Sequence, residues 1–179
     1  MMQSLDVGLD MDAKIKQAQG WHAELALQFS DRGDKTVLKH KTQIGPLSIQ
    51  RPLYPEQHIC HVYLLHPPSG VVGGDSLNIT AQLSSGAHTL VTTPGATKFY
   101  RSEQRLAKQV QTLTVADNAT LEWLTQENIF FPDSHVQVDT HIRLYGSARF
   151  MGWELHCFGR PALDEVFTAG QLRGKTEIF

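Results

Sequence analysis

The chain has 179 residues, 41% of them hydrophobic, which is enough for one compact domain with a buried core. Its 16 basic and 18 acidic residues give a net charge of -2, which offers no electrostatic basis for binding nucleic acid or an anionic membrane. Two cysteines are too few for a disulfide framework, no signal-like segment opens the chain, and no apolar run approaches the roughly 20 residues of a membrane helix. We therefore expect a soluble protein of the reducing cytoplasm.

The first nineteen residues show neither a helical nor a strand period, and we interpret them as a tail or a short helix. From Trp21 to Phe29, apolar residues recur at every second position, which is typical of a strand with one buried face. The same rhythm of short strand and turn continues along the chain. It predicts further strands over residues 37–43, 47–51, 59–66, 77–83, 88–93, 110–115, 120–124, 136–144, 149–158 and 165–169.

The one candidate helix after the tail covers residues 98–109, where the periodicity is weak. Neither a repeat of about 20–50 residues nor an alternation of strands with helices is visible in the sequence. We therefore predict an all-β fold over residues 20–179, with many short strands in two packed or coiling sheets and at most one or two short helices. Because residues 175–179 resemble the beginning of a strand, we expect the domain to be incomplete at its carboxy-terminal end. The sheet edge exposed there predicts self-association.

Two segments superficially suggest anion or nucleotide binding. Residues 170–176 resemble a phosphate-binding loop, but three residues separate Gly170 from Gly174 where about four are needed. Residues 94–98 form a second candidate anion loop with Arg101 and Arg105 nearby, and we favour a tight structural turn there. The sequence has no G-x-S-x-G elbow, which argues against a serine hydrolase of that type.

Residues 58–75 contain the side chains most suited to metal ligation. Imidazole and thiolate groups suit nickel, zinc and copper, but a strand would place His58 and Cys60 on one face and His61 on the other. We favour a buried structural cysteine beside partly buried histidines, and keep Cys60 with His61 as an alternative ligand cluster. Asp75, which follows Gly73 and Gly74, is on its own grounds a turn residue.

Several unusual segments occur in a fixed order along the chain. They are GW at 20–21, GPLSIQRPLYPE at 45–56, CHVYLLHPP at 60–68, GGD at 73–75, TPGATKFYRS at 93–102, LEWL at 121–124, QE at 126–127 and GRP at 159–161. Together they resemble the urease accessory proteins of the UreD/UreH family, from about residue 20 to the end. Ser69, Leu53 and Asp34 are small departures from the family pattern, and family members continue well beyond this length.

The resemblance implies a non-catalytic cytoplasmic scaffold that helps deliver nickel to the urease active site. Its implied partners are the urease apoprotein subunits, a helical accessory protein of the UreF type and, indirectly, a GTPase of the UreG type. Nickel would be cargo in transit through a water-filled tunnel, with no tightly bound cofactor. Such a path favours oxygen ligands that release the ion easily.

The family pattern also indicates which residues line this path. By resemblance, Asp75, Glu154 and Thr97 match tunnel positions, and the weaker candidates are Glu122, Glu127, Cys60 and His61. Two alternative functions remain open from the sequence. One is an all-β hydrolase that uses residues 58–75, and the other is a purely structural binding module.

Overall fold

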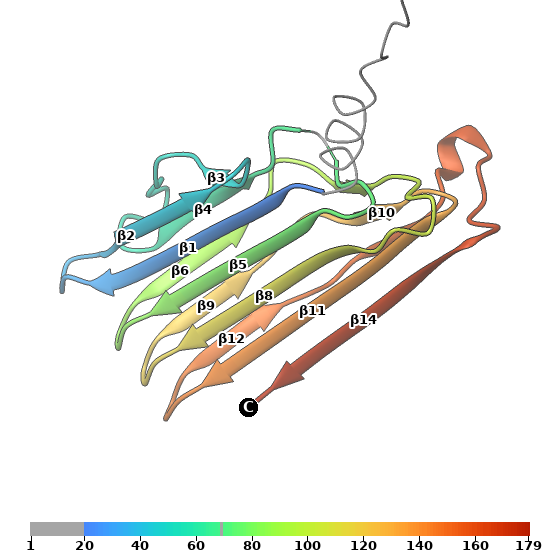
Figure 1. Cartoon of the computed structure of the whole chain (residues 1–179). Helices are drawn as coiled ribbons and strands as arrows, with labels where there is room; N and C mark the ends of the chain where they lie inside the picture. The colour runs from blue at the N-terminus through green and yellow to red at the C-terminus, as the bar shows by residue number, and fades with distance from the viewer. Residues whose placement is uncertain (1–19, 69) are drawn as a thin grey trace, which may run out of the picture.

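The computed structural model describes residues 20–68 and 70–179, so the segment predicted as a tail or short helix lies outside the described residues. Over this described part, the strands form three sheets (Figure 1). The first sheet has the order β14-β11-β8-β5-β1-β2, the second β12-β9-β6-β4-β3 and the third β13-β10-β7. The strands are β1 His22–Asp31, β2 Thr36–Ile44, β3 Ser48–Ile49, β4 Cys60–Leu65, β5 Ser76–Leu83, β6 His88–Thr92, β7 Thr97–Phe99, β8 Ala107–Val115, β9 Thr120–Trp123, β10 Asn128–Phe130, β11 Ser134–Leu144, β12 Arg149–Gly152, β13 His156–Phe158 and β14 Gly170–Ile178.

From β5 onward the chain visits the three sheets in turn. Strands β5, β6 and β7 make one circuit, β8, β9 and β10 the next, and β11, β12 and β13 a third before β14 returns to the first sheet. Each strand pairs in parallel with its counterpart in the neighbouring circuit. The fold is therefore all-β, as predicted, with packed mixed sheets in a β-solenoid-like arrangement (Figure 1).

The prediction that the chain has no internal repeat is wrong at the level of structure. Leu77 pairs with Gln109, Gln109 with Val138 and Val138 with Gly174, so the successive circuits take 32, 29 and 36 residues. The repeat leaves no sequence signature, because each circuit needs only strands with alternating inward side chains and turns between the strands. Different residues meet these two requirements in different circuits. Parallel pairing of strands so far apart is not visible in a local pattern.

Most of the longer predicted strands are confirmed, and the differences occur in short or irregular segments. The helix predicted over residues 98–109 is wrong, because β7 ends at Phe99, β8 begins at Ala107, and Glu103 and Gln104 between them have positive φ. Residues 166–169 form no strand, and the strand of that region is β14. Strands β7 and β10 have three residues each, too few to show an alternating pattern. One short 3-10 helix, Pro161–Leu163, fits the predicted limit.

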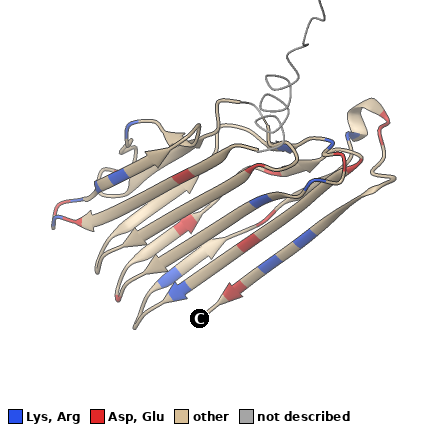
Figure 2. Cartoon of the chain, in the orientation of Figure 1, with Lys and Arg blue, Asp and Glu red and all other residues tan. Residues whose placement is uncertain are grey.

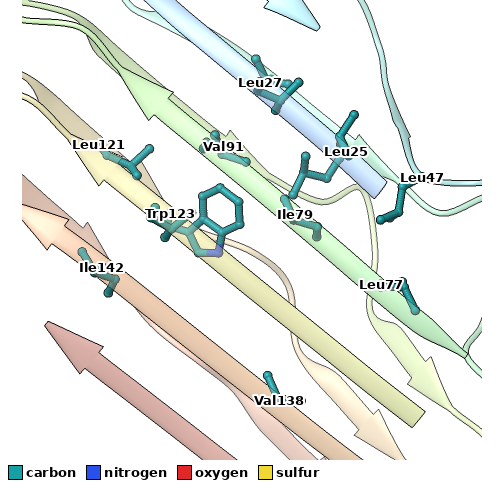
Figure 3. Close-up of a cluster of buried hydrophobic side chains, with 14 of the residues drawn as sticks. Leu25, Leu27, Leu47, Leu77, Ile79, Val91, Leu121, Trp123, Val138 and Ile142 are labelled. Atoms are coloured by element: carbon teal, nitrogen blue, oxygen red, sulfur yellow. The ribbon is translucent and has the colours of Figure 1, made fainter. Parts of the chain in front are cut away.

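The core fills the space that the sheets enclose. Inward side chains of β1, β5, β8 and β11 alternate with outward ones, and the inward set includes Leu25, Ile79, Leu113 and Ile142. Figure 3 shows Trp123 of β9 among these apolar side chains, which come from the first and second sheets. No helix within residues 20–68 or 70–179 has the length and hydropathy of a membrane span.

Candidate functional site

A cavity of about 340 Å³ lies between the inward face of the first sheet and the corners that follow β4, β6, β9 and β12. Apolar residues of β4 and β5 line one part of it, and amides, hydroxyls and a carboxylate line the rest. The polar lining residues are His66, Thr93, Thr97, Lys98, Gln109, Gln111, Thr125, Gln126, Asn128 and Glu154. The cavity therefore offers several oxygen ligands of the kind that hold a hard or borderline cation weakly.

The cavity is polar because one inward column of the first sheet changes character along the solenoid. Neighbouring strands contribute Leu25, Ile79, Gln111, Thr140 and Thr176 in register. The column is apolar in β1 and β5 and polar from β8 onward, and both Gln111 and Thr140 are buried. Sequence reasoning missed these residues, although a threonine inside the apolar alternation of β11 and two glutamines at alternate positions of β8 were the available signal.

The buried polar groups satisfy one another through a chain of hydrogen bonds. The indole Nε1 of Trp123 donates to Oε1 of Gln111 over 2.9 Å, and Nε2 of Gln111 donates to Oγ1 of Thr140 over 3.0 Å. Oγ1 of Thr140 donates to Oε1 of Glu154 over 2.5 Å, and Oγ1 of Thr176 donates to Oε2 of the same carboxylate over 3.1 Å. Both oxygens of Glu154 are thus held by neutral hydroxyl groups.

Glu154 reaches the cavity from the corner between β12 and β13. The neighbouring Trp153 fixes this corner, because its indole Nε1 donates to the carbonyl oxygen of Thr125 over 2.8 Å. Among the described residues, Glu154 forms no ion pair. A partly buried carboxylate with only neutral partners favours an incoming cation.

Thr97, the first residue of β7, also lines the cavity. Its backbone N–H donates to the carbonyl oxygen of Glu127 over 2.9 Å, which holds the corner of residues 94–98 against the next circuit. The segment considered as an anion loop is therefore a corner of the solenoid. Lys98 lines the same cavity, so the charge there is not uniformly negative.

Asp75 lies outside the lining of this cavity, at the entrance to β5. Its Oδ1 accepts the backbone N–H of Trp21 over 2.8 Å and its Oδ2 accepts that of Val72 over 2.9 Å. The carboxylate thereby closes the turn that contains Gly74, whose φ of 95° suits glycine, and ties the start of β1 to it. This geometry is that of a structural cap.

His66 lines the cavity and is affected electrostatically by Asp75. Burial lowers the pKa of His66 below its usual value, and the negative charge of Asp75 partly opposes this effect. The imidazole is therefore neutral at physiological pH. As a lining residue, it therefore brings no positive charge to the cavity.

The two other predicted glutamates do not line the cavity. Glu122 projects from β9, and its Oε1 lies 2.7 Å from Nε2 of His88. Glu127 contributes its backbone carbonyl to Thr97, as described above. The structure thus brings Glu154 and Thr97 together around one cavity and places Asp75, Glu122 and Glu127 away from its wall.

Cys60 and His61 point to different surroundings, as the strand pattern predicts. Cys60 is fully buried, and burial raises the pKa of its thiol despite a hydrogen bond with Tyr54. Burial likewise raises the pKa of Tyr54, to about 12. Nε2 of His61 lies 3.1 Å from Oε1 of Glu56. This pair therefore provides neither a thiolate nor a shared ligand set at neutral pH.

The cysteines provide a direct test of this environment. In the native protein we expect Cys157, which is half-buried, to react with Ellman's reagent about tenfold or more faster than Cys60, because a buried thiol of raised pKa is rarely ionised or accessible. Denaturant should make both thiols reactive. The assay is a thiol count over time, with Cys157→Ser as the control, and rapid labelling of Cys60 in that variant would contradict the structure.

A closed metal centre is absent from the described part of the chain, where no group of three or more His, Cys, Asp or Glu side chains could hold an ion. The hydrolase alternative is also weakened for residues 58–75. Within this segment, burial raises the pKa of the Cys60 thiol, and the carboxylate of Asp75 accepts hydrogen bonds from two backbone N–H groups. What the geometry provides is a polar cavity with one carboxylate available to a passing cation.

Comparison with known proteins identifies a family for this arrangement. The model of the UreD urease accessory protein family matches residues 22–179. A urease accessory protein UreD of Aliivibrio fischeri is 56% identical over 161 residues, which cover 90% of this chain and 56% of that protein. Proteins of the same name from Escherichia coli and Klebsiella aerogenes are 55% and 50% identical, and the matches cover 58% and 60% of their lengths. The chain thus spans less than two thirds of these relatives.

Proposed function

Because the chain belongs to the UreD family of urease accessory proteins, we propose that it is a non-catalytic cytoplasmic scaffold through which nickel reaches urease. Nickel is the cargo of this scaffold and not a resident cofactor. The observation that carries the proposal is the placement of Glu154 at the wall of a polar cavity, with both carboxylate oxygens held by hydroxyl groups and no ion pair among the described residues.

A path for an ion needs ligands that bind and then release it. A centre with four protein ligands would trap nickel, whereas a single carboxylate with hydroxyl and amide neighbours exchanges it readily. Glu154 and Thr97 are the path residues that this cavity supports, together with the amides of Gln109 and Gln111. Asp75 supports the path indirectly, by fixing the turn before β5 and by acting on His66.

The partners of the scaffold follow from the same proposal. We propose that it binds the urease apoprotein and a helical accessory protein of the UreF type, and that the latter recruits a GTPase of the UreG type. The family's printed name supports a role beside urease. Acidic and basic residues are spaced widely along the strands of the first sheet (Figure 2). Such a charge distribution suits contact with another protein better than contact with a polyanion.

The test is urease activation in cells that express the urease subunits and the other accessory proteins together with this chain. We expect Glu154→Gln to lower both urease activity and the nickel content of purified urease by about tenfold, because the amide keeps the shape but loses the charge that attracts a cation. Recovery of urease with the scaffold should not change. Glu122→Gln is the matched control, since Glu122 lies outside the cavity wall.

The outcomes separate the competing functions. Full activation by Glu154→Gln combined with Thr97→Val would favour a purely structural module, because the cavity would then be dispensable. Saturable turnover of a small molecule by the purified chain would favour the hydrolase. The unsubstituted Klebsiella aerogenes relative is the positive control for activation, since it contains residues that this chain does not span.

A further inference from the structure

We infer that Trp123, Gln111 and Thr140 form a one-way hydrogen-bond relay that aims a hydroxyl at Glu154 and makes it compete with any cation for that carboxylate. The inference rests on the proposed function, because it concerns a cation that reaches Glu154. It goes further by assigning a positioning role to three residues, two of which lie behind the cavity wall.

The direction of the relay follows from the chemistry of its first member. An indole N–H can only donate, so the Gln111 atom that faces Trp123 is the carbonyl oxygen and the amide nitrogen must face Thr140. That nitrogen also can only donate. The oxygen of Thr140 is therefore already an acceptor, and its single hydrogen is left for Glu154.

Burial makes this orientation obligatory. Trp123 and Thr140 are each 3% exposed and Gln111 is 5% exposed, so these three side chains have little access to bulk solvent. If the Gln111 amide were flipped, its NH₂ group would face the indole N–H of Trp123, so that two donors would meet without an acceptor. Thr140 would also lose the donor that Gln111 provides. The cost would be comparable to that of a lost buried hydrogen bond. The relay crosses the lumen from β9 to β8 and β11, and Figure 3 shows the Trp123 indole extending into this interior.

The relay sets how tightly Glu154 holds a cation. At rest, Thr140 and Thr176 each donate to one carboxylate oxygen, so a cation that binds either oxygen shares its negative charge with a hydroxyl or displaces that hydroxyl. The exchange requires no proton transfer, because hydroxyl donors are replaced without being ionised. A carboxylate satisfied in this way binds a cation more weakly than an unsatisfied one, which favours release along a path.

This mechanism predicts an effect of unusual sign. Thr140→Val removes the competing hydroxyl while keeping the shape of the side chain, so it should strengthen cation binding at Glu154 several-fold. Thr176→Val removes the other hydroxyl at an exposed position, where misfolding is not a concern, and should act in the same direction. Thr140→Ser should restore ordinary affinity. A merely structural role of these threonines would weaken binding or leave it unchanged.

The experiment is a titration of the full chain with Zn²⁺, a diamagnetic ion that accepts similar ligands, followed through the ¹⁵N-labelled indole groups. The chain has three tryptophans, and Trp21 serves as an internal reference because its side chain is 60% exposed. In the metal-free protein, Thr140→Val should shift the Trp123 resonance, whereas the outward-facing Thr112→Val should not. Zn²⁺ should shift the Trp123 resonance in the natural sequence and not in Thr140→Val.

The outcomes distinguish the two proposals. If Zn²⁺ binding depends on Glu154 but neither threonine variant strengthens it and the Trp123 resonance never moves, the relay is wrong and the cation path stands. If the resonance responds to Thr140→Val but Glu154→Gln leaves Zn²⁺ binding unchanged, the relay exists and the proposed path through Glu154 is wrong. If both valine variants bind Zn²⁺ more strongly and Glu154→Gln binds it more weakly, the result supports both the relay and the cation path.

Discussion

Replacing Phe130 with alanine is expected to lower the free energy of unfolding by about 3–5 kcal/mol, the range for a large aromatic deleted from a core. Phe130 is fully buried at the centre of a ladder that the third sheet builds from successive circuits. Its ring stacks on Phe99 with centroids 5.1 Å apart and on Phe158 with centroids 5.5 Å apart. The substitution therefore leaves a cavity and removes both stacked phenyl contacts, together with an edge contact to His156.

Phe158→Ala is the matched control, because Phe158 is the outer ring of the same ladder and is 48% exposed. We expect a loss of about 1 kcal/mol, mainly the aromatic pair itself. Equilibrium unfolding in urea measures the free energy of unfolding of both variants. The two values can be compared if the dependence of that free energy on urea concentration is unchanged. Equal losses in the two variants would show that the ladder is not the element that holds successive circuits together.

The strands that were predictable from the sequence are those with one buried face and enough residues to show it. His22–Asp31 and Ser134–Leu144 alternate over about ten positions, and both form as the period-2 pattern predicts. In the third sheet, β7 and β10 were not predicted, because three residues carry no period, and β13 was predicted only as the end of one strand over residues 149–158, which the structure divides into β12 and β13. The solenoid-like circuit was not predictable from the sequence. The parallel pairing of strands depends on the turns between them and on packing between segments that are distant in the chain.

The candidate site was predictable only in part, and for a similar reason. Glu154 and Thr97 were reached through a family resemblance, and the structure places both at one cavity. Gln111 and Thr140 were not reached as site residues, because the alternation that groups Thr140 with the apolar residues of β11 does not indicate which polar groups it meets inside the fold. Their burial becomes intelligible only when Trp123, from another sheet, supplies the donor that satisfies Gln111.

The second large effect is expected at Asp75. Asp75→Ala should lower the free energy of unfolding by about 2–4 kcal/mol, because it leaves two backbone N–H groups without their charged acceptor in a site that is 6% exposed. The affected groups join the start of β1 to the turn before β5. At that junction a Cβ added to Gly20 would lie 2.0 Å from the backbone carbon of Gly74, so the segments have no room to rearrange.

Asp139→Ala is the control for Asp75→Ala, since Asp139 faces outward on β11 and bonds a single side chain, Gln137. We expect it to change stability by less than about 1 kcal/mol, measured by the same urea unfolding. A small loss for Asp75→Ala, similar to that of Asp139→Ala, would contradict the structural role of this carboxylate.

Stability and urease activation measured on the same Asp75 variant separate its two candidate roles. If Asp75 acts as a cap, activation should fall only in proportion to the folded protein, and lowering the temperature should restore it. If Asp75 also lies on the path of the ion, activation should fall further than folding does, as for Glu154→Gln, which removes no backbone partner. Its hydrogen bonds favour the first result, because the two backbone N–H groups draw on the negative charge of Asp75 and hold the carboxylate at the β1 junction.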